Sequence, residues 1–519
     1  MRESIRSRLC WSLAALLASA AAVTIPQPVG PSHAELAGSL SWTACPTDIR
    51  PFKGNNFTTA LQCANISVPL DYQDAGAPQI QLGIVKLPAQ GQRIGNLFVN
   101  PGGPGGAASS MVLSMASKRL YISDAVRQRF DIVGMDPRGV GLSTPMKCDT
   151  SIANQPSDFD ATTPDGFQKT FAYAKALGES CRAMSGPVFD HMDTVLVARD
   201  MEVVRVGKCS LMLFSAAGNE PMNYFGLSYG TQLGAQYAAL FPGAIRAMAL
   251  DGILQHTGSF AANIMTQATS LDATIQEFFR FCEANPANCG DGGQNIRQTW
   301  NKVLEVAAAG QLKAAECDGT PKTLCVPIGT PNNVIGAARS TLEFARDRKT
   351  FAAALKLGAA GNGSFFTPSL LSGDVFSDSG ALAITNIQCQ DGHFFAAKDH
   401  VEVQRVADMT RTLTTTPGMG EFWRRVIDCT GYPVKITNPR TPLNVQKTEN
   451  PVLLVHSRFD PATSFVYAAG MMEEFQNAAL VIREGSGHTS YLVKGDASRV
   501  VDEYLIDLKI PPAGTVVQT

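Results

Sequence analysis

The sequence predicts an α/β protein in which a mostly parallel β-sheet carries helices on both faces and is interrupted by an inserted, mainly helical segment. Two observations predict this class. Short apolar runs rich in β-branched residues alternate with helical runs, often across glycine-rich turns. This alternation stops near Ser259, gives way to Ala-rich helical runs, and returns near residue 444. We therefore expect a first core part at 36–258, a helical cap at 259–443 and a C-terminal core part at 444–519.

The composition is that of an ordinary globular protein. The chain has 519 residues, of which 45% are apolar, and a formal net charge of −2. It holds no basic run beyond its N-terminus. The charge pattern therefore gives no support for a nucleic-acid partner or for binding to an anionic membrane surface.

The N-terminus has the pattern of a secretory signal peptide at residues 1–22. Three arginines at positions 2, 6 and 8 precede an apolar run from Leu9 to Val23, and small residues from Ser19 to Ala22 offer cleavage sites. The alternative is an uncleaved membrane anchor, for which this run is short. We therefore expect a secreted protein that has no membrane segment after cleavage of the signal.

Cysteine usage also favours export. The chain has 12 cysteines, and leaving out Cys10 in the signal leaves eleven. Most fall in pairs close along the chain, without the nearby histidines of a metal site, so we expect disulfides and neither a metal nor another cofactor. Asn-x-Ser/Thr acceptors fit the same route, at Asn56, Asn65 and Asn362. The hypothetical disulfides are Cys45–Cys63, Cys148–Cys181, Cys282–Cys289, Cys317–Cys325 and Cys389–Cys429.

The odd cysteine, Cys209, lies in a segment, 207–218, that interrupts the passage from a helical run at Thr194–Val206 to the next strand. One hypothesis is a translated intron or a lineage-specific insertion that impairs activity. The alternative is a surface loop with a free thiol. Under the first hypothesis ten cysteines remain, and all of them can pair.

Strands are expected first at Ile66–Tyr72, Ile80–Leu87 and Asn96–Asn100. The third runs into a glycine-rich loop, residues 101–108, and a helical run follows. One interpretation is a phosphate cradle of the dinucleotide-binding type, but Pro104 removes a backbone donor there and no acidic residue ends a second strand at the usual distance. The favoured interpretation is an oxyanion loop in which Gly103 supplies the donor.

The next expected strand, Phe130–Asp136, ends in another turn rich in glycine at Pro137–Ser143. Asp136 and Arg138 have two interpretations. They are either catalytic or, as we favour, a buried pair that holds this turn beneath the glycine-rich loop.

A strand expected at Met222–Leu227 meets the pentapeptide Gly226-Leu227-Ser228-Tyr229-Gly230, and a helical run rich in small residues follows. This is the pattern of a nucleophile elbow, in which a strained turn lifts a serine hydroxyl above the sheet. Glycines on either side remove side chains that would collide. The elbow makes Ser228 the candidate nucleophile and the Tyr229 N–H a candidate oxyanion donor.

A serine nucleophile needs a base beside it and a group that orients the base. Of seven histidines, only His488 follows a late strand in a loop of small residues. Asp460 ends the preceding expected strand, with Asp251 as the fallback acid. The chain order of Ser228, Asp460 and His488 is that of α/β-hydrolases. Because the mechanism needs a neutral imidazole, we expect activity to fall below about pH 6.5.

These residues belong to a larger set of motifs, namely Asn100–Gly106, Asp136–Ser143, Gly226–Gly230, Leu250–Gly252, Asp460–Thr463 and Gly485–His488, with Trp42–Cys45 and Cys63–Asp71 near the N-terminus. The set resembles the secreted tripeptidyl/prolyl aminopeptidase group of α/β-hydrolases, which are serine peptidases with a TAP-like C-terminal segment. The resemblance covers nearly the whole mature chain, although the tail lacks a cysteine often found in that group.

The resemblance implies Ser228 as nucleophile, His488 as base, Asp460 as its orienting acid, and Gly103 with Tyr229 as oxyanion donors. Asp391 resembles a carboxylate that holds the free amine of the substrate; the alternative is a solvent-facing cap residue. We expect an exopeptidase that cleaves short peptides or single residues from free N-termini through an acyl-enzyme. Two alternatives stay open: an esterase, amidase or lactone hydrolase of a small metabolite, and an inactive binding protein. The partner is thus a peptide or small-molecule substrate, and the oligomeric state is open.

Overall fold

The computed structural model describes residues 40–47, 51–53, 61–207, 220–317, 323–425 and 427–518. The expected signal peptide, Asn56 and Cys209 lie outside these described residues.

Within the described residues, one sheet contains ten strands in the order β1-β2-β3-β5-β4-β6-β7-β8-β9-β10. The pairs β1–β2, β2–β3 and β3–β5 are antiparallel. From β5 onward every neighbouring pair is parallel, so the carboxyl ends of these strands share one edge. The strands are β1 Thr43–Ala44, β2 Gln62–Pro69, β3 Gln79–Leu87, β4 Gly95–Asn100, β5 Phe130–Met135, β6 Met222–Leu227, β7 Ile245–Asp251, β8 Val452–Phe459, β9 Ala478–Ser486 and β10 Val516–Gln518.

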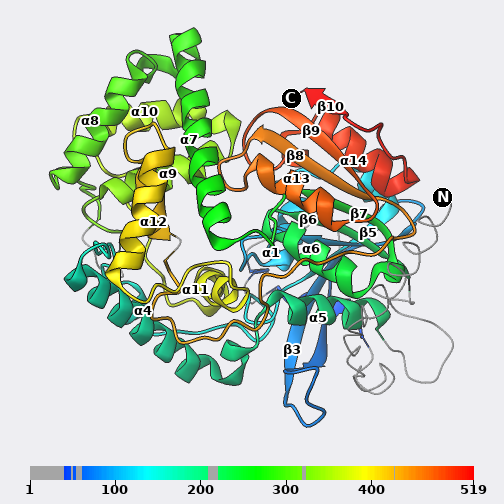
Figure 1. The fold of residues 1–519 in the computed structure, drawn as a ribbon. Coiled ribbons are helices and arrows are strands. Elements are labelled where there is room, and N and C mark those ends of the chain that lie inside the picture. Colours follow the sequence, from blue (N-terminus) through cyan, green and yellow to red (C-terminus); the bar gives the residue numbers. More distant parts are fainter. Residues whose placement is uncertain are drawn as a thin grey trace, which may run out of the picture.

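Helices cover both faces of the sheet (Figure 1). Alternate strand residues point to opposite faces: Phe98 and Tyr224 share an apolar cluster with α5, α6 and α13, whereas Leu97 and Phe225 share another with α1, α2 and α14. The α/β sheet predicted from the sequence is confirmed. The helices of this part are α1 Ala108–Ala116, α2 Asp124–Arg129, α3 Thr150–Ala153, α4 Pro164–Ser185, α5 Thr194–Val206, α6 Tyr229–Leu240, α13 Phe465–Glu474 and α14 Asp496–Asp507.

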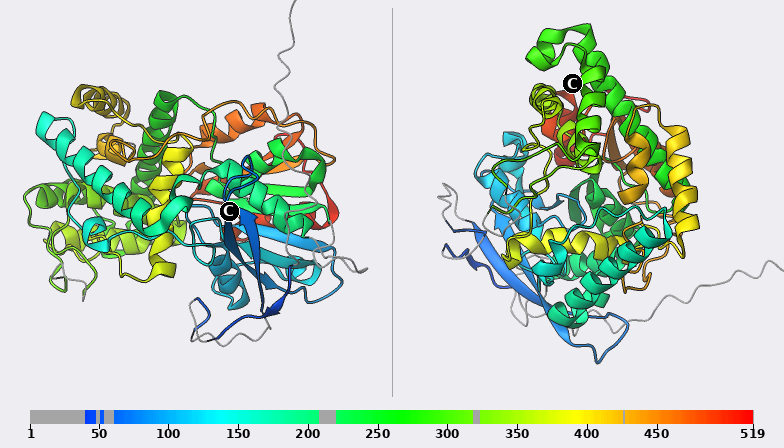
Figure 2. Two further views of the ribbon diagram at one scale, coloured as in Figure 1. Left: turned by 90° about the horizontal axis from the view of Figure 1, so that it is seen from below. Right: turned by 90° about the vertical axis from the view of Figure 1, so that its left-hand side faces the viewer.

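The remaining helices gather to one side of the sheet (Figures 1 and 2). Most of them surround an apolar cluster of their own that includes Trp300 and Trp423. We call these helices the cap. They are α7 Phe260–Ala284, α8 Ile296–Ala308, α9 Pro331–Leu342, α10 Arg348–Ala359, α11 Val375–Gln390 and α12 His400–Leu413, with the short helix η5 at Met419–Arg425.

Two helices depart from the division expected at residues 259 and 443. Phe167 of α4 packs in the cap cluster, although α4 precedes the elbow in the chain. Conversely, Ala383 and Ile387 of α11 pack in the cluster on the α5–α6 face of the sheet. The domain boundaries therefore stay a prediction. Part of α4 packs with the cap, and part of α11 packs with the sheet core.

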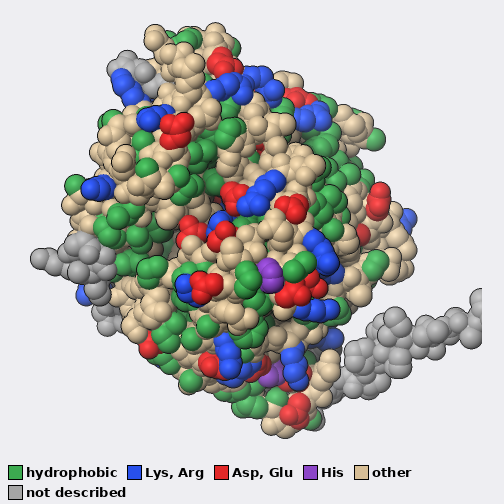
Figure 3. Space-filling model, turned by 60° about the vertical axis from the view of Figure 1, so that its left-hand side comes forward, with side chains coloured by type: hydrophobic (Ala, Val, Ile, Leu, Met, Phe, Trp, Pro, Cys, Tyr) green, Lys and Arg blue, Asp and Glu red, His purple; other side chains and the backbone are tan. Residues whose placement is uncertain are grey.

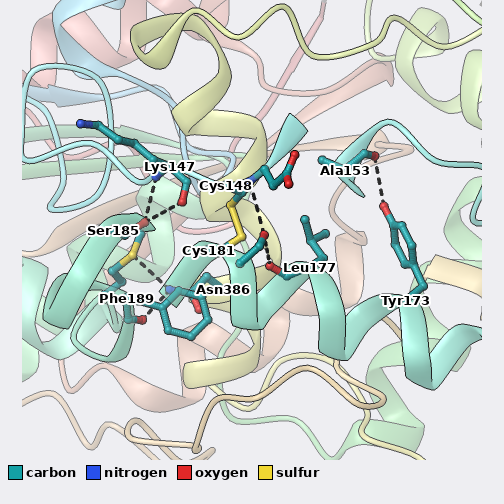
Figure 4. Close-up of a disulfide and its surroundings, with 12 residues drawn as sticks. Lys147, Cys148, Ala153, Tyr173, Leu177, Cys181, Ser185, Phe189 and Asn386 are labelled. Atoms are coloured by element: carbon teal, nitrogen blue, oxygen red, sulfur yellow. Dashed lines mark hydrogen bonds between the residues drawn. A yellow bond between two sulfur atoms is a disulfide. The ribbon is translucent and has the colours of Figure 1, made fainter. Parts of the chain in front are cut away.

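Five disulfides join the cysteine pairs expected from the sequence: Cys45–Cys63, Cys148–Cys181, Cys282–Cys289, Cys317–Cys325 and Cys389–Cys429. Figure 4 shows Cys148–Cys181, which ties the segment before α3 to α4.

The surface in Figure 3 carries lysine and arginine side chains interspersed with aspartate and glutamate. Asn65 and Asn362 are exposed, as glycosylation acceptors must be. Across the part of the chain that the structure describes, no helix is both long and apolar enough to cross a bilayer.

Candidate active site

The turn at Ser228 has the strained geometry of a nucleophile elbow. β6 ends at Leu227 and α6 begins at Tyr229, and Ser228 between them has φ 57° and ψ −126°. Such a backbone costs about 1–3 kcal/mol for a residue with a side chain, and it persists only where the surroundings enforce it. The flanking glycines allow the close packing: a Cβ on Gly230 would lie 2.8 Å from the Asn100 carbonyl oxygen, and one on Gly226 would lie 2.6 Å from the Tyr224 ring.

The glycine-rich loop lies directly against this elbow. A Cβ on Gly102 would lie 2.7 Å from Ser228 Cβ and 3.0 Å from the Tyr229 nitrogen. The Gly102 N–H donates to the Asn100 side chain at 2.9 Å. Within the described residues, neither the Gly103 N–H nor the Tyr229 N–H at the start of α6 donates a hydrogen bond. Gly102 thus packs against the elbow, and the N–H groups of Gly103, the next residue, and of Tyr229 stay the predicted oxyanion donors.

Asp460 and His488 form a buried pair on the loops that follow β8 and β9. His488 Nδ1 and Asp460 Oδ2 are 2.7 Å apart, and the Asp460 side chain is fully buried. Burial alone would raise the pKa of Asp460, but the His488 ring and the main-chain N–H of Thr463 outweigh it and lower that pKa to about 2. A charged carboxylate at Nδ1 holds the proton there, so Nε2 is the basic nitrogen of the neutral ring.

The His488 ring lies beside the strand that supports the elbow. A Cβ on Gly252 would lie 3.1 Å from His488 Cε1. The preceding residue, Asp251, accepts the Ser228 main-chain N–H on its carbonyl oxygen at 2.9 Å. Within the described residues, the Ser228 hydroxyl makes no hydrogen bond to the ring. The fold thus brings the serine loop and the histidine loop together.

Asp251, the fallback acid, serves a different purpose. Its buried carboxylate accepts the main-chain N–H groups of Ser490 at 2.7 Å and Tyr491 at 2.8 Å. It therefore fixes the chain just after His488, and it is not the hydrogen-bond partner of the ring.

Sequence reasoning missed two buried residues that hold the same loops. Arg483 Nη2 donates to the carbonyl oxygens of Ser486, Gly487 and Thr489 at 3.1–3.2 Å. His456 Nδ1 accepts the Ile253 N–H at 2.9 Å, and burial lowers the pKa of His456 to about 4. Both side chains lie in strands whose sequence predicts only that they are buried. Their hydrogen-bond partners are main-chain groups, which no sequence pattern identifies.

Asp136 and Arg138 are both buried, as the favoured interpretation expects, but they do not pair with each other. Asp136 accepts the N–H of Ser109 at 2.7 Å and that of Leu142 at 2.8 Å, so it ties α1 to the Pro137–Ser143 turn. Arg138 forms a fully buried bidentate pair with Asp200 at 2.7 and 2.8 Å. Asp136 still supports the helix that follows the glycine-rich loop, as the favoured interpretation requires.

Asp391 is not placed to hold a substrate amine, which corrects that expectation and the alternative of a solvent-facing residue. The residue is 1% exposed. Its carboxylate accepts the Thr194 N–H at 3.0 Å, the Asn438 side chain at 2.8 Å and the Gln232 side chain at 3.2 Å. A buried carboxylate with so many donors is part of the scaffold. The sequence could not reveal this, because the donors come from three distant segments.

The cap reaches the base through Glu343, which follows α9. Its carbonyl oxygen accepts the His488 main-chain N–H at 2.7 Å. Burial opposes protonation of His488, but Asp460 and then Glu343 outweigh it and raise its pKa above the usual 6.5. The Glu343 carboxylate is 3.7 Å from Arg339, and its side chain is 22% exposed. Across the described residues, no group of three or more His, Cys, Asp or Glu side chains is arranged to hold a metal ion.

A serine on a strained strand-to-helix turn, with an aspartate and a histidine on the loops after later parallel strands, defines the α/β-hydrolase class. Residues 95–291 match the family model described as alpha/beta hydrolase fold, and residues 416–517 match the model described as TAP-like protein. The chain is therefore an α/β-hydrolase with a TAP-like C-terminal segment.

Among curated proteins, the chain is similar to the tripeptidyl aminopeptidase of Streptomyces coelicolor, with 28% identity over 502 residues that span 92% of this chain and 85% of the relative. It is similar to carboxylesterase B of Mycobacterium tuberculosis, with 28% identity over 526 residues that span 93% of this chain and 90% of the relative. A third relative is serine protease Hip1 of Mycobacterium tuberculosis, 29% identical over 260 residues, which are 49% of this chain and 47% of the relative.

Proposed function

We propose that this α/β-hydrolase is a serine peptidase that removes short peptides or single residues from free N-termini. The observation that carries the proposal is the buried Asp460–His488 pair at 2.7 Å, on loops that adjoin the strained Ser228. The similarity to a tripeptidyl aminopeptidase and a serine protease favours a peptide substrate.

In the proposed mechanism, Ser228 Oγ attacks the scissile carbonyl carbon while His488 Nε2 takes the hydroxyl proton. The charge that develops on the carbonyl oxygen is stabilised by the N–H groups of Gly103 and Tyr229. The protonated ring then gives its proton to the leaving amine, which breaks the C–N bond and leaves an acyl-enzyme. Water, deprotonated by the same ring, releases the acyl group and restores Ser228. Asp460 orients the ring and stabilises its charged form.

Because Asp391 is sealed in the scaffold, the substrate ammonium needs another carboxylate. We propose Glu343, since its main chain contacts His488 and its partly exposed carboxylate pairs loosely with Arg339, at 3.7 Å. At a pH above the acid limb, Glu343→Gln should raise KM for unblocked peptides and leave turnover of uncharged esters nearly unchanged. The matched control is Glu305→Gln on α8, where the glutamate is 67% exposed and pairs with Lys302.

The second candidate is an esterase, amidase or lactone hydrolase, which uses the same groups on a small metabolite. The similarity to carboxylesterase B favours it. Turnover of a tripeptidyl arylamide, its N-acetylated form and a simple aryl ester separates the two functions. A requirement for the free amine supports the peptidase, whereas equal turnover of the acetylated peptide rejects it. An inactive binding protein, the third hypothesis, predicts that a fluorophosphonate does not label Ser228, and that result would reject both enzyme functions.

Export is the proposed location. It is supported by five disulfides, which persist in oxidising compartments, together with the signal-like N-terminus. Asn65 and Asn362 are the proposed glycosylation sites within the described residues.

A further inference from the structure

We propose that α11 aligns both donors of the oxyanion hole, with Gly380 acting on the glycine-rich loop and Asp391 acting on the elbow. These are positioning residues that do not touch the substrate. The inference rests on the proposed function, because it assumes that Gly103 and Tyr229 stabilise an oxyanion beside Ser228.

The first contact joins the middle of α11 to the glycine-rich loop. A Cβ on Gly380 would lie 2.5 Å from the Gly105 carbonyl oxygen, closer than side-chain carbons approach backbone oxygens. The neighbouring Ser379 hydroxyl accepts the Gly141 N–H at 3.0 Å, and both groups are buried. Gly380 thus lets the helix backbone meet the loop directly, two residues beyond the proposed donor Gly103.

The second contact joins the C-terminal end of α11 to the elbow. Asp391 is the C-cap of α11, and its carboxylate accepts the Thr194 hydroxyl. The Thr194 oxygen lies 2.6 Å from the Tyr229 hydroxyl. Since Thr194 gives its proton to Asp391, the Tyr229 hydroxyl donates to Thr194. This chain of hydrogen bonds fixes the side chain of the residue whose main-chain N–H is the second proposed donor.

The helix is itself held to the sheet core, so it can serve as a fixed reference. Asn386 and Gln390 both donate to the Phe189 carbonyl oxygen, at 2.8 and 2.7 Å, and Figure 4 shows Asn386 reaching Phe189. The Cys389–Cys429 disulfide fixes its end. Ala383 and Ile387 pack in the core cluster.

An oxyanion hole works only when both donors lie within about 2.7–3.1 Å of one oxygen. The two donors here come from separate segments of the chain, the loop after β4 and the start of α6. One rigid helix in contact with both segments sets the spacing between them. Although α11 belongs to the inserted segment, it is therefore required for the chemical step and not only for substrate binding.

The test measures phosphonylation of Ser228 by an alkyl fluorophosphonate. In this reaction the Ser228 Oγ–P bond forms, the P–F bond breaks, fluoride leaves and His488 takes the hydroxyl proton. The phosphoryl oxygen occupies the oxyanion hole in the transition state. The first variant is Gly380→Ala. The second is Tyr229→Phe, a substitution that keeps the main-chain N–H and removes only the side-chain hydroxyl. The third variant is Asp391→Asn. If it fails to fold, Tyr229→Phe still tests the hydrogen-bond chain from Asp391 through Thr194 to Tyr229.

The matched controls come from the same inserted segment. Gly336→Ala places a methyl group on α9 where nothing lies within 4 Å. Asp378→Asn changes the buried carboxylate at the other end of α11, which holds the main-chain N–H of Gly373 and does not contact the hole. Thermal unfolding midpoints show that each variant is folded.

We expect kinact to fall at least tenfold in Gly380→Ala and Tyr229→Phe, with KI within twofold of wild type, while both controls retain the wild-type kinact. The same split should hold for kcat and KM with p-nitrophenyl acetate. An unchanged kinact in both variants would overturn the inference. A rise in KI without a fall in kinact would also overturn it. If wild-type Ser228 is not phosphonylated at all, the proposed function itself fails, and the inference fails with it.

Discussion

The main-chain N–H of His488 donates to the carbonyl oxygen of Glu343 at 2.7 Å, so the proposed catalytic base is bound to the cap as well as to Asp460. The same neighbour contributes a negative charge that, after Asp460, helps to raise the pKa of His488 above 6.5. The environment of the base is thus shared between the sheet core and the inserted helices.

The acid limb of the pH–activity profile should therefore have its midpoint above pH 6.5, and not at the ordinary histidine value. Activity needs the neutral ring, so it is lost as the pH falls through the raised pKa. We expect Glu343→Gln to move the midpoint to lower pH, as measured by kcat/KM with p-nitrophenyl acetate, which carries no amine. Glu305→Gln should leave it in place. A midpoint that does not respond to Glu343→Gln contradicts the assigned cause.

Ser228→Ala should remove turnover and leave the fold intact. Loss of a triad nucleophile reduces kcat by roughly 10⁶, and a small residual rate comes from the remaining groups. Release of product from an arylamide measures the loss, and circular dichroism measures folding. Retention of more than about a hundredth of the wild-type rate would exclude Ser228 as nucleophile.

Asp460→Asn should reduce kcat by roughly 10⁴, because an amide at this position no longer holds the His488 proton on Nδ1. The acid limb of the profile should also move to lower pH, since the main charge that raises the pKa of His488 is gone. Asp251→Asn serves as comparison. It weakens the anchor of Ser490 and Tyr491 and should act mainly on stability. A larger kcat loss in Asp251→Asn than in Asp460→Asn would reverse the assignment.

Asp200→Asn should lower the free energy of unfolding by about 3–5 kcal/mol, because it leaves the fully buried Arg138 guanidinium without its carboxylate. Denaturant unfolding measures the change. On the surface, Asp165→Asn removes the partner of Lys169, where the carboxylate is 78% exposed, and should change stability by no more than about 1 kcal/mol. Equal effects of the two substitutions would mean that burial of the Arg138 pair does not matter.

The parts of the fold and site that could be predicted from the sequence are those that depend on residues close together in the chain. The apolar run before Ser228 and the small residues after it specify a strand, a tight turn and a helix without any distant contact. Asp460 and His488 could be selected because each follows a strand, and strand ends in a parallel sheet share one edge. The cysteine pairs lie close enough along the chain for spacing to suggest them.

The parts that could not be predicted depend on which distant segments meet. Asp391 has the sequence context of an exposed helix end, yet Thr194, Gln232 and Asn438 enclose it. Arg483 reads as one charged residue in an apolar strand, yet it holds three carbonyl oxygens of the histidine loop. Whether a charged side chain is buried depends on partners far away in the chain. Local patterns in a single sequence do not identify those partners.

The packing of Phe167 with Trp300 and Trp423 has a consequence for folding order. During synthesis, α4 emerges well before the helices that bury it, so its apolar face stays uncovered while β6, β7 and most of the insertion follow. Contacts between such remote segments slow folding, since the entropy of closing a very long loop must be overcome first. The apolar face of α4 is therefore a site of possible aggregation until the cap helices that bury it have been made.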